Sequence, residues 1–125
     1  MILGLGLDLV ERYRAEASYR RWGEKLVAKL MDPDEAARLG ELAPARDLAI
    51  GMSIALKEAG SKAIGTGWSR GVRWRDVVVE TQPGLHLRLT NRAAEVARRL
   101  GSSGRTHAQL ELRGELILAE VRLLT

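Results

Sequence analysis

Three side chains, Asp8, Glu58 and Lys62, have the types and spacing that metal-assisted phosphate chemistry requires. Glu58 and Lys62 are four residues apart in a segment of helical periodicity, so both would project from one helix face, about 6 Å apart along the axis. Mg²⁺ prefers one or two protein carboxylates and completes its octahedron with water and substrate phosphate oxygens. A carboxylate beside an amine could therefore hold a metal and a phosphate together.

Asp8 interrupts an apolar amino-terminal run that otherwise has the composition of a buried strand. A core strand rarely carries an unpaired carboxylate, and Asp8 could be the second ligand of the same metal. Two simpler explanations stay open. Asp8 could lie at the strand end, where it would accept backbone N–H bonds or cap the following helix. Glu58 and Lys62 could form a surface ion pair that contributes only a few tenths of a kcal/mol.

Gly65, Thr66 and Gly67 follow this helix as a Gly-rich exit. A lone Gly-x-Gly is weak support for phosphate binding, so a helix C-cap followed by a turn is the better default explanation. The exit would matter for phosphate binding only if Lys62 reached the same anion.

The composition limits the kinds of protein that could carry these residues. A chain of 125 residues, 46% of them hydrophobic, predicts one domain over residues 1–125. It has no cysteine, and its two histidines lie far from other potential ligands in the sequence, so a hard cation on carboxylates is favoured over zinc.

The charge and the amino terminus bear on partners and location. A net charge of +4 and a pI near 10.0 favour an anionic partner, which could be a nucleic acid, a phosphorylated small molecule or an acidic protein. The sequence shows neither a signal peptide nor a segment long enough to span a bilayer, which predicts a cytoplasmic protein with no membrane partner.

The elements that must position the candidate residues are predicted in the order β-α-α-α-β-β-α-β-β. They are a strand over 2–10, a basic helix over 11–30 with a possible break at Gly23, a helix that begins at Asp32-Pro33 and ends near 42, a long helix over 45–64, a hairpin over 72–89, a helix over 90–100, and strands around 110–112 and 116–124. This order predicts an α+β fold with an antiparallel sheet packed against a long central helix.

Taken together, two motifs resemble those of the holo-acyl-carrier-protein synthases, the small group of 4′-phosphopantetheinyl transferases. They are Gly4-Leu5-Gly6-Leu7-Asp8-Leu9 with Glu11, and Lys57-Glu58-Ala59-Gly60-Ser61-Lys62-Ala63 followed by Gly65-Thr66-Gly67. The likeness in length and element order covers nearly the whole chain. It implies transfer of the 4′-phosphopantetheine arm from coenzyme A to a serine of an apo acyl carrier protein in fatty acid or polyketide biosynthesis, with release of adenosine 3′,5′-bisphosphate.

The resemblance also implies roles for individual residues. Asp8 and Glu58 would hold Mg²⁺ on the pyrophosphate of coenzyme A, and Lys62 would neutralise charge that develops on the phosphate or leaving group. The exit at residues 65–67 would share the coenzyme with Lys62.

Members of the family are usually homotrimers with sites shared between subunits, and their acceptor is an acidic helical protein. The resemblance implies that Arg14, Arg20 and Arg21 on the first helix dock this carrier, although ordinary solvation also explains arginines on a surface helix.

The chain departs from the family pattern at three places. Relatives commonly carry an arginine and an aromatic residue where this chain has Ser53 and Ile54, and a strand ending in histidine where it has residues 109–112. A Gly-x-Pro turn appears only as residues 84–86.

These departures leave two interpretations open, an active but divergent transferase and a non-catalytic relative that acts as an interaction module. We expect activity, because the proposed metal ligands and Lys62 are intact. A basic nucleic-acid-binding domain would fit the pI, but the sequence has no recognition motif and few aromatic residues, so no nucleic-acid partner is expected.

Overall fold

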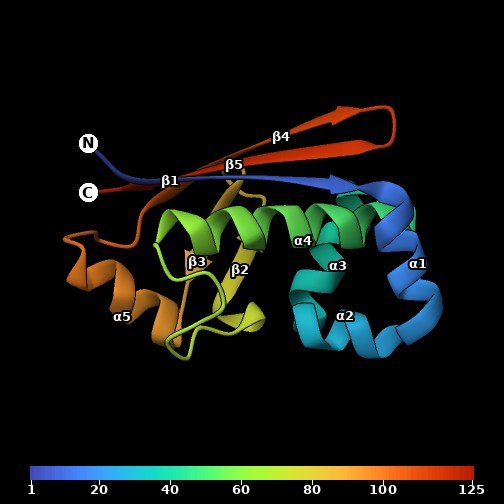
Figure 1. Ribbon diagram of the computed structural model, residues 1–125, viewed down its shortest axis with the longest axis horizontal. Helices are drawn as coiled ribbons and strands as arrows, with labels where there is room; N and C mark the ends of the chain where they lie inside the picture. The colour runs from blue at the N-terminus through green and yellow to red at the C-terminus, as the bar shows by residue number, and fades with distance from the viewer.

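The computed structural model describes residues 1–125 and arranges them around one long helix, α4 (Arg46–Ala63) (Figure 1). A three-stranded antiparallel sheet in the order β1-β5-β4 lies along one side of α4, and a two-stranded sheet, β2-β3, lies on the other side. None of the helices combines the length and apolarity that crossing a membrane requires. The elements follow one another as β1 (Ile2–Glu11), α1 (Arg12–Trp22), α2 (Glu24–Leu30), α3 (Pro33–Leu42), α4, a 3₁₀ turn (Trp74–Asp76), β2 (Val77–Glu80), β3 (His86–Leu89), α5 (Asn91–Arg99), β4 (Thr106–Arg113) and β5 (Leu116–Leu124).

This order confirms the predicted α+β fold, with a long central helix against an antiparallel sheet. The first predicted helix is divided at Gly23, whose φ of 59° separates α1 from α2. The start of α3 is also as predicted, because Asp32 Oδ1 accepts a hydrogen bond from the Glu35 amide at 2.9 Å and Pro33 occupies the first helical position. Local patterns in the sequence thus place these helix ends.

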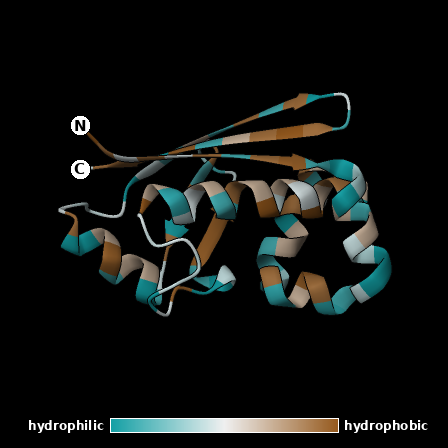
Figure 2. Ribbon diagram, in the orientation of Figure 1, coloured by the Kyte–Doolittle hydropathy of each residue, from teal (hydrophilic) through white to brown (hydrophobic).

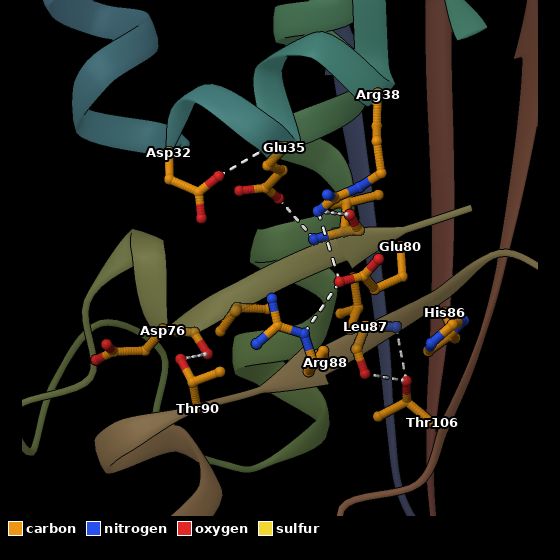
Figure 3. A network of polar contacts seen from close by, with 12 residues as sticks. Asp32, Glu35, Arg38, Asp76, Glu80, His86, Leu87, Arg88, Thr90 and Thr106 are labelled. Atoms are coloured by element: carbon orange, nitrogen blue, oxygen red, sulfur yellow. Dashed lines mark hydrogen bonds and ion pairs between the residues drawn. The ribbon is translucent and has the colours of Figure 1, made fainter. Parts of the chain in front are cut away.

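The strands form two sheets instead of one. The smaller sheet meets β4 through the Thr106 hydroxyl, which accepts a hydrogen bond from Leu87 N–H and donates one to Leu87 C=O, each at 2.7 Å (Figure 3). A backbone bond from Ala108 N–H to Leu85 C=O at 3.2 Å supports the same contact. A hydroxyl therefore replaces part of a regular ladder between β3 and β4, and this division was not predicted from the sequence.

Two glycines allow β1 to lie directly against the backbone of α4. A Cβ atom on Gly4 would come within 1.9 Å of Ala63 O, and one on Gly6 would come within 1.8 Å of Ala59 O. No side chain fits at these separations, so glycine is required at both positions. Residues of equal parity share a face of a strand, so Asp8 continues the row of Gly4 and Gly6 toward α4.

The opposite face of β1 is exposed, so the expectation of a buried strand is wrong for the single chain. Leu5, Leu7 and Leu9 are 55%, 51% and 56% exposed. Apolar residues also run along the neighbouring strand β5, where Leu116 and Leu118 are 41% and 38% exposed (Figure 2). These five leucines are called the apolar outer face below, and they share this side of the sheet with Glu120 and Arg122, which lie opposite Leu7 and Leu5.

The open edge of β2 is closed by charged side chains instead of another strand. Lys57 and Glu35 are completely buried and form an ion pair, with Nζ 3.1 Å from Oε1. Lys57 also donates to Val77 C=O. Glu35 Oε2 accepts from Val79 N–H at 2.6 Å, and Arg38 donates to Val79 C=O at 3.2 Å (Figure 3). These side chains supply the hydrogen bonds that a neighbouring strand would otherwise make.

Candidate functional site

The contact between β1 and α4 brings Asp8 and Lys62 together from positions 54 residues apart. Lys62 Nζ lies 3.0 Å from Asp8 Oδ1 and donates a second hydrogen bond to Leu7 C=O at 3.0 Å. The Asp8 side chain is 18% exposed and that of Lys62 is 51% exposed. The ammonium group is therefore held in place at its base while one side still faces solvent.

Asp8 does not cap the following helix. α1 begins after Glu11, and no side chain accepts a hydrogen bond from its first turn. The alternative explanation for Asp8, that of a helix cap, is therefore not what the structure shows. Its carboxylate instead faces the helix that carries the second candidate motif.

Glu58 lies one turn before Lys62 on α4 and is only partly exposed. No ion pair within 4.0 Å joins Glu58 to Lys62, and the Glu58 carboxylate has no hydrogen-bond partner in the protein. The simple surface ion pair is thus absent, because Lys62 turns to Asp8 instead. Gly6 packs against Ala59, the residue after Glu58, so the free carboxylate lies on the part of α4 that β1 crosses.

The donor set at this crossing fits one kind of metal. No group of three or more acidic, histidine or cysteine side chains is positioned to bind an ion. Two carboxylates suit Mg²⁺, which completes its shell with water and substrate phosphate oxygens, and they do not suit a closed structural zinc site. Because Asp8 and Glu58 both remain accessible, they could supply those two carboxylates.

The Gly-rich exit forms the C-terminal cap of α4. The amides of Thr66 and Gly67 both donate to Ser61 C=O, at 3.2 and 3.1 Å, and Gly65 N–H donates to Lys62 C=O at 3.0 Å. Gly65 and Gly67 have φ values of 81° and 57°, which explains the choice of glycine. Their amides are thus used to end the helix just after Lys62, and coenzyme binding by residues 65–67 stays a prediction.

The three predicted docking arginines lie on α1 and reach solvent. Arg14 pairs with Glu11 at 3.2 Å and is 72% exposed, and Arg20 pairs with Glu16 and is 75% exposed. The Arg21 guanidinium lies 4.9 Å from the centre of the Trp22 ring, which is itself 55% exposed. The helix therefore presents cations beside an exposed aromatic side chain.

Ser53 and residues 109–112 are two of the places where the sequence was expected to depart from the family pattern. Ser53 is completely buried, and its hydroxyl has no hydrogen-bond partner. Leu112 lines a groove of about 840 Å³ beside β4. Most of the groove is apolar, with Leu48, Met52 and Leu110 among its walls and Glu111 as one of its few charged groups.

Comparison with known proteins identifies what this arrangement is similar to. A family described as the 4′-phosphopantetheinyl transferase superfamily matches residues 4–117. A holo-(acyl-carrier-protein) synthase of Methylobacterium sp. (strain 4-46) is 44% identical over 96 residues, which are 75% of this chain and 70% of the relative. The crystal structure of holo-(acyl-carrier-protein) synthase from Neisseria meningitidis superposes with a TM-score of 0.86 at 23% identity and full coverage of both chains. The synthase of Bacillus anthracis in complex with CoA (3′,5′-ADP) superposes with a TM-score of 0.73 at 25% identity, covering 98% of this chain and 96% of that one.

Proposed function

The chain belongs to the 4′-phosphopantetheinyl transferase superfamily, and on that premise we propose that it is a holo-acyl-carrier-protein synthase. It transfers the 4′-phosphopantetheine arm of coenzyme A to a serine of an apo acyl carrier protein. The observation that supports this proposal is the contact between Lys62 and Asp8 where β1 crosses α4, with Glu58 one helical turn before Lys62. The cytoplasmic location expected from the sequence is part of the same proposal.

In the proposed reaction the serine oxygen forms a bond to the β-phosphorus of coenzyme A. The bond from that phosphorus to the oxygen of the leaving adenosine 3′,5′-bisphosphate breaks, and the serine proton leaves with a base. Asp8 and Glu58 would hold Mg²⁺, which when bound neutralises charge on the pyrophosphate oxygens. Phosphoryl transfer is catalysed mainly by positioning and charge stabilisation, which is what these side chains can provide.

Lys62 has the geometry to contact the phosphate. A lysine ammonium has three N–H donors, and Lys62 uses one on Asp8 and one on Leu7 C=O. The third remains for a phosphate oxygen, because the side chain is half-exposed. Asp8 would therefore act twice, as a ligand of the metal and as the group that orients the ammonium.

The carrier is proposed to dock on α1 through Arg14, Arg20 and Arg21. α1 continues directly from β1, so Arg14 is only six residues from Asp8 along the chain. Contacts between these arginines and an acidic carrier would mainly raise the association rate and would weaken with salt.

The apolar outer face supports assembly into the homotrimer that the family resemblance implies. Isolated soluble proteins rarely expose a row of large apolar side chains. Leu5, Leu7 and Leu9 form such a row along β1, with Leu118 opposite Leu9 and the Glu120–Arg122 ion pair opposite Leu7 and Leu5. A second copy of the chain is the proposed partner for this face.

The proposal is tested by incubating the protein with Mg²⁺, coenzyme A and several apo carriers and recording intact mass. We expect a carrier gain of about 340 Da, the mass of the arm, as the direct readout of this reaction class. Asp8→Asn and Glu58→Gln should abolish it, whereas the control Glu95→Gln on α5 should not. Gain in all variants would refute the assignment of the carboxylates.

A second function is suggested by the chemistry at two positions where the sequence departs from the family pattern. The Ser53 hydroxyl is buried without a hydrogen-bond partner, and Leu112 lines a mostly apolar groove. If polar groups are needed at these positions for coenzyme A, the chain would be a non-catalytic relative that acts as an interaction module. No mass gain with any carrier, together with no coenzyme A binding by calorimetry, would support that alternative over transferase activity.

A further inference from the structure

α1, the helix that carries the three exposed arginines, is fixed to the first turn of α4 at its beginning and at its end. At the beginning, Arg12 forms a bidentate ion pair with Asp47, in which Arg12 Nε lies 2.7 Å from Asp47 Oδ2 and Arg12 Nη2 lies 3.3 Å from Asp47 Oδ1. These side chains are 32% and 22% exposed. The Arg12 amide also donates to Glu115 C=O at 2.7 Å, so the β4–β5 turn holds the same point.

At the far end of α1 the adjacent residue of α4 makes the second contact. Arg46 Nη2 lies 2.7 Å from both carboxylate oxygens of Glu24, the first residue of α2. Tyr19, near the end of α1, donates its hydroxyl to the same carboxylate at 2.9 Å. The Arg46 guanidinium is also 6.0 Å from the Tyr19 ring centre.

The two ion pairs run in opposite directions between the helices, so only one pairing of these four side chains brings opposite charges together. The α1–α2 side supplies the cation of the first pair and the anion of the second, while α4 supplies Asp47 and Arg46. The hydrogen bond from Arg12 lowers the pKa of Asp47, and the hydrogen bond from Arg46 lowers that of Glu24. An exchange of partners would place like charges together, which discriminates against other placements of α1.

We propose that the Arg12–Asp47 and Glu24–Arg46 pairs, called the α1 clamp below, are positioning residues that set the angle of α1 and thereby aim the docked carrier at Glu58. This inference rests on the proposed function. The clamp residues would thus control the carrier's approach without touching the coenzyme or the carrier. No short sequence motif indicates this, because Arg12 and Asp47 are 35 residues apart.

Because α1 is long, a small change in its angle at the clamp moves its far end by a large distance. α1 has 11 residues and is therefore about 16 Å long. A tilt of about 10° at one end moves the other end by about 3 Å, whereas reacting atoms must approach to about 3–3.5 Å. Glu58 lies on the same rigid helix as the clamp residues, eleven positions after Asp47. Loosening the clamp should thus harm carrier engagement and leave coenzyme binding on α4 and β1 intact.

The test compares Asp47→Asn, Arg46→Gln and their double variant with the wild-type chain. Glu95→Gln is the matched control, because the Arg92–Glu95 pair on α5 is a similar 2.7 Å ion pair outside the clamp. We expect the KM for carrier to rise about tenfold in the double variant, which corresponds to about 1.4 kcal/mol. The KM for coenzyme A should change by less than about twofold. The charge swap Arg12→Asp with Asp47→Arg should recover most of the loss seen in Asp47→Arg alone.

Hydrogen exchange and the kinetic constants together test whether the clamp positions α1. Hydrogen exchange should become faster in the amides of α1 but not of α5 when the clamp is loosened. An unchanged carrier KM, equal losses for both substrates, or no rescue by the swap would overturn the inference. If the wild-type chain transfers no arm, the proposed function fails; unchanged α1 exchange in the double variant would show separately that the clamp does not hold α1.

Discussion

The buried ion pair between Lys57 and Glu35 makes a strong prediction about stability. Replacing Lys57 with methionine fills a similar volume but leaves the Glu35 carboxylate without its counter-charge in a site that is 0% exposed. It also removes one donor each from the carbonyls of Trp74 and Val77. Breaking a buried pair from one side typically costs about 3–5 kcal/mol, against about 5–15 kcal/mol for the total stability of a domain. Lys57→Met should therefore lose a large part of the free energy of unfolding.

The double variant Lys57→Met with Glu35→Leu separates the charge effect from the hydrogen bonds. It removes both charges. It also leaves Val79 N–H, which donates to Glu35 Oε2 at 2.6 Å in the wild type, without a partner on the open edge of β2. An unpaired buried amide costs about 1–3 kcal/mol. The double variant should thus be more stable than Lys57→Met but less stable than the wild type.

The dependence on pH follows from the pKa directions. Burial raises the pKa of Glu35 and lowers that of Lys57, in each case against the attraction of the partner's charge. In Lys57→Met that attraction is gone, so the folded state binds a proton on Glu35 more tightly than the unfolded state does. Stability then rises as pH falls from the raised folded pKa toward the ordinary value of 4.5. Because burial raises the pKa of Glu35 in the wild type as well, the deficit relative to the wild type should shrink between the folded pKa of the variant and the lower folded pKa of the wild type.

Urea unfolding monitored by circular dichroism measures these differences, with Lys25→Met on the exposed side of α2 as the control. The control should stay within about 0.5 kcal/mol of the wild type, as expected for a surface substitution. A Lys57→Met loss below about 1 kcal/mol, or a deficit that grows at lower pH, would refute the reasoning.

Three other predictions concern the site and the surface. Lys62→Ala should lower kcat by about a hundredfold in the transfer assay, while Lys62→Arg retains part of the rate; equal rates for the two variants would contradict a charge role. Gly6→Ala should lose both fold stability and transfer, because its Cβ would lie 1.8 Å from Ala59 O; a normal melting temperature would contradict the close contact. Leu118→Asp should convert a trimer to a monomer by light scattering, and a wild-type chain that is already monomeric would contradict the assembly proposal.

The sequence predicted part of the site, but it did not predict which residue pairs with Lys62. The motif around Glu58 and Lys62 indicated their chemistry and their shared helix face, but its local spacing suggested that they pair with each other. The structure instead pairs Lys62 with Asp8. Only the close approach of β1, permitted by Gly4 and Gly6, brings that carboxylate within reach, and a contact between distant segments leaves no trace in helical periodicity.

The sequence alone determined what depends on neighbouring residues: the order of the elements, the break at Gly23, the cap of α3 at Asp32 and the end of α4 at Gly65. Capping, backbone freedom and hydrophobic period act over a few residues, so they can be read locally. The tertiary structure decided the division into two sheets, the burial of Lys57 and the clamp on α1. These depend on which surfaces pack together, because a charged side chain acquires its partner, and therefore its role, only when the chain has folded around it.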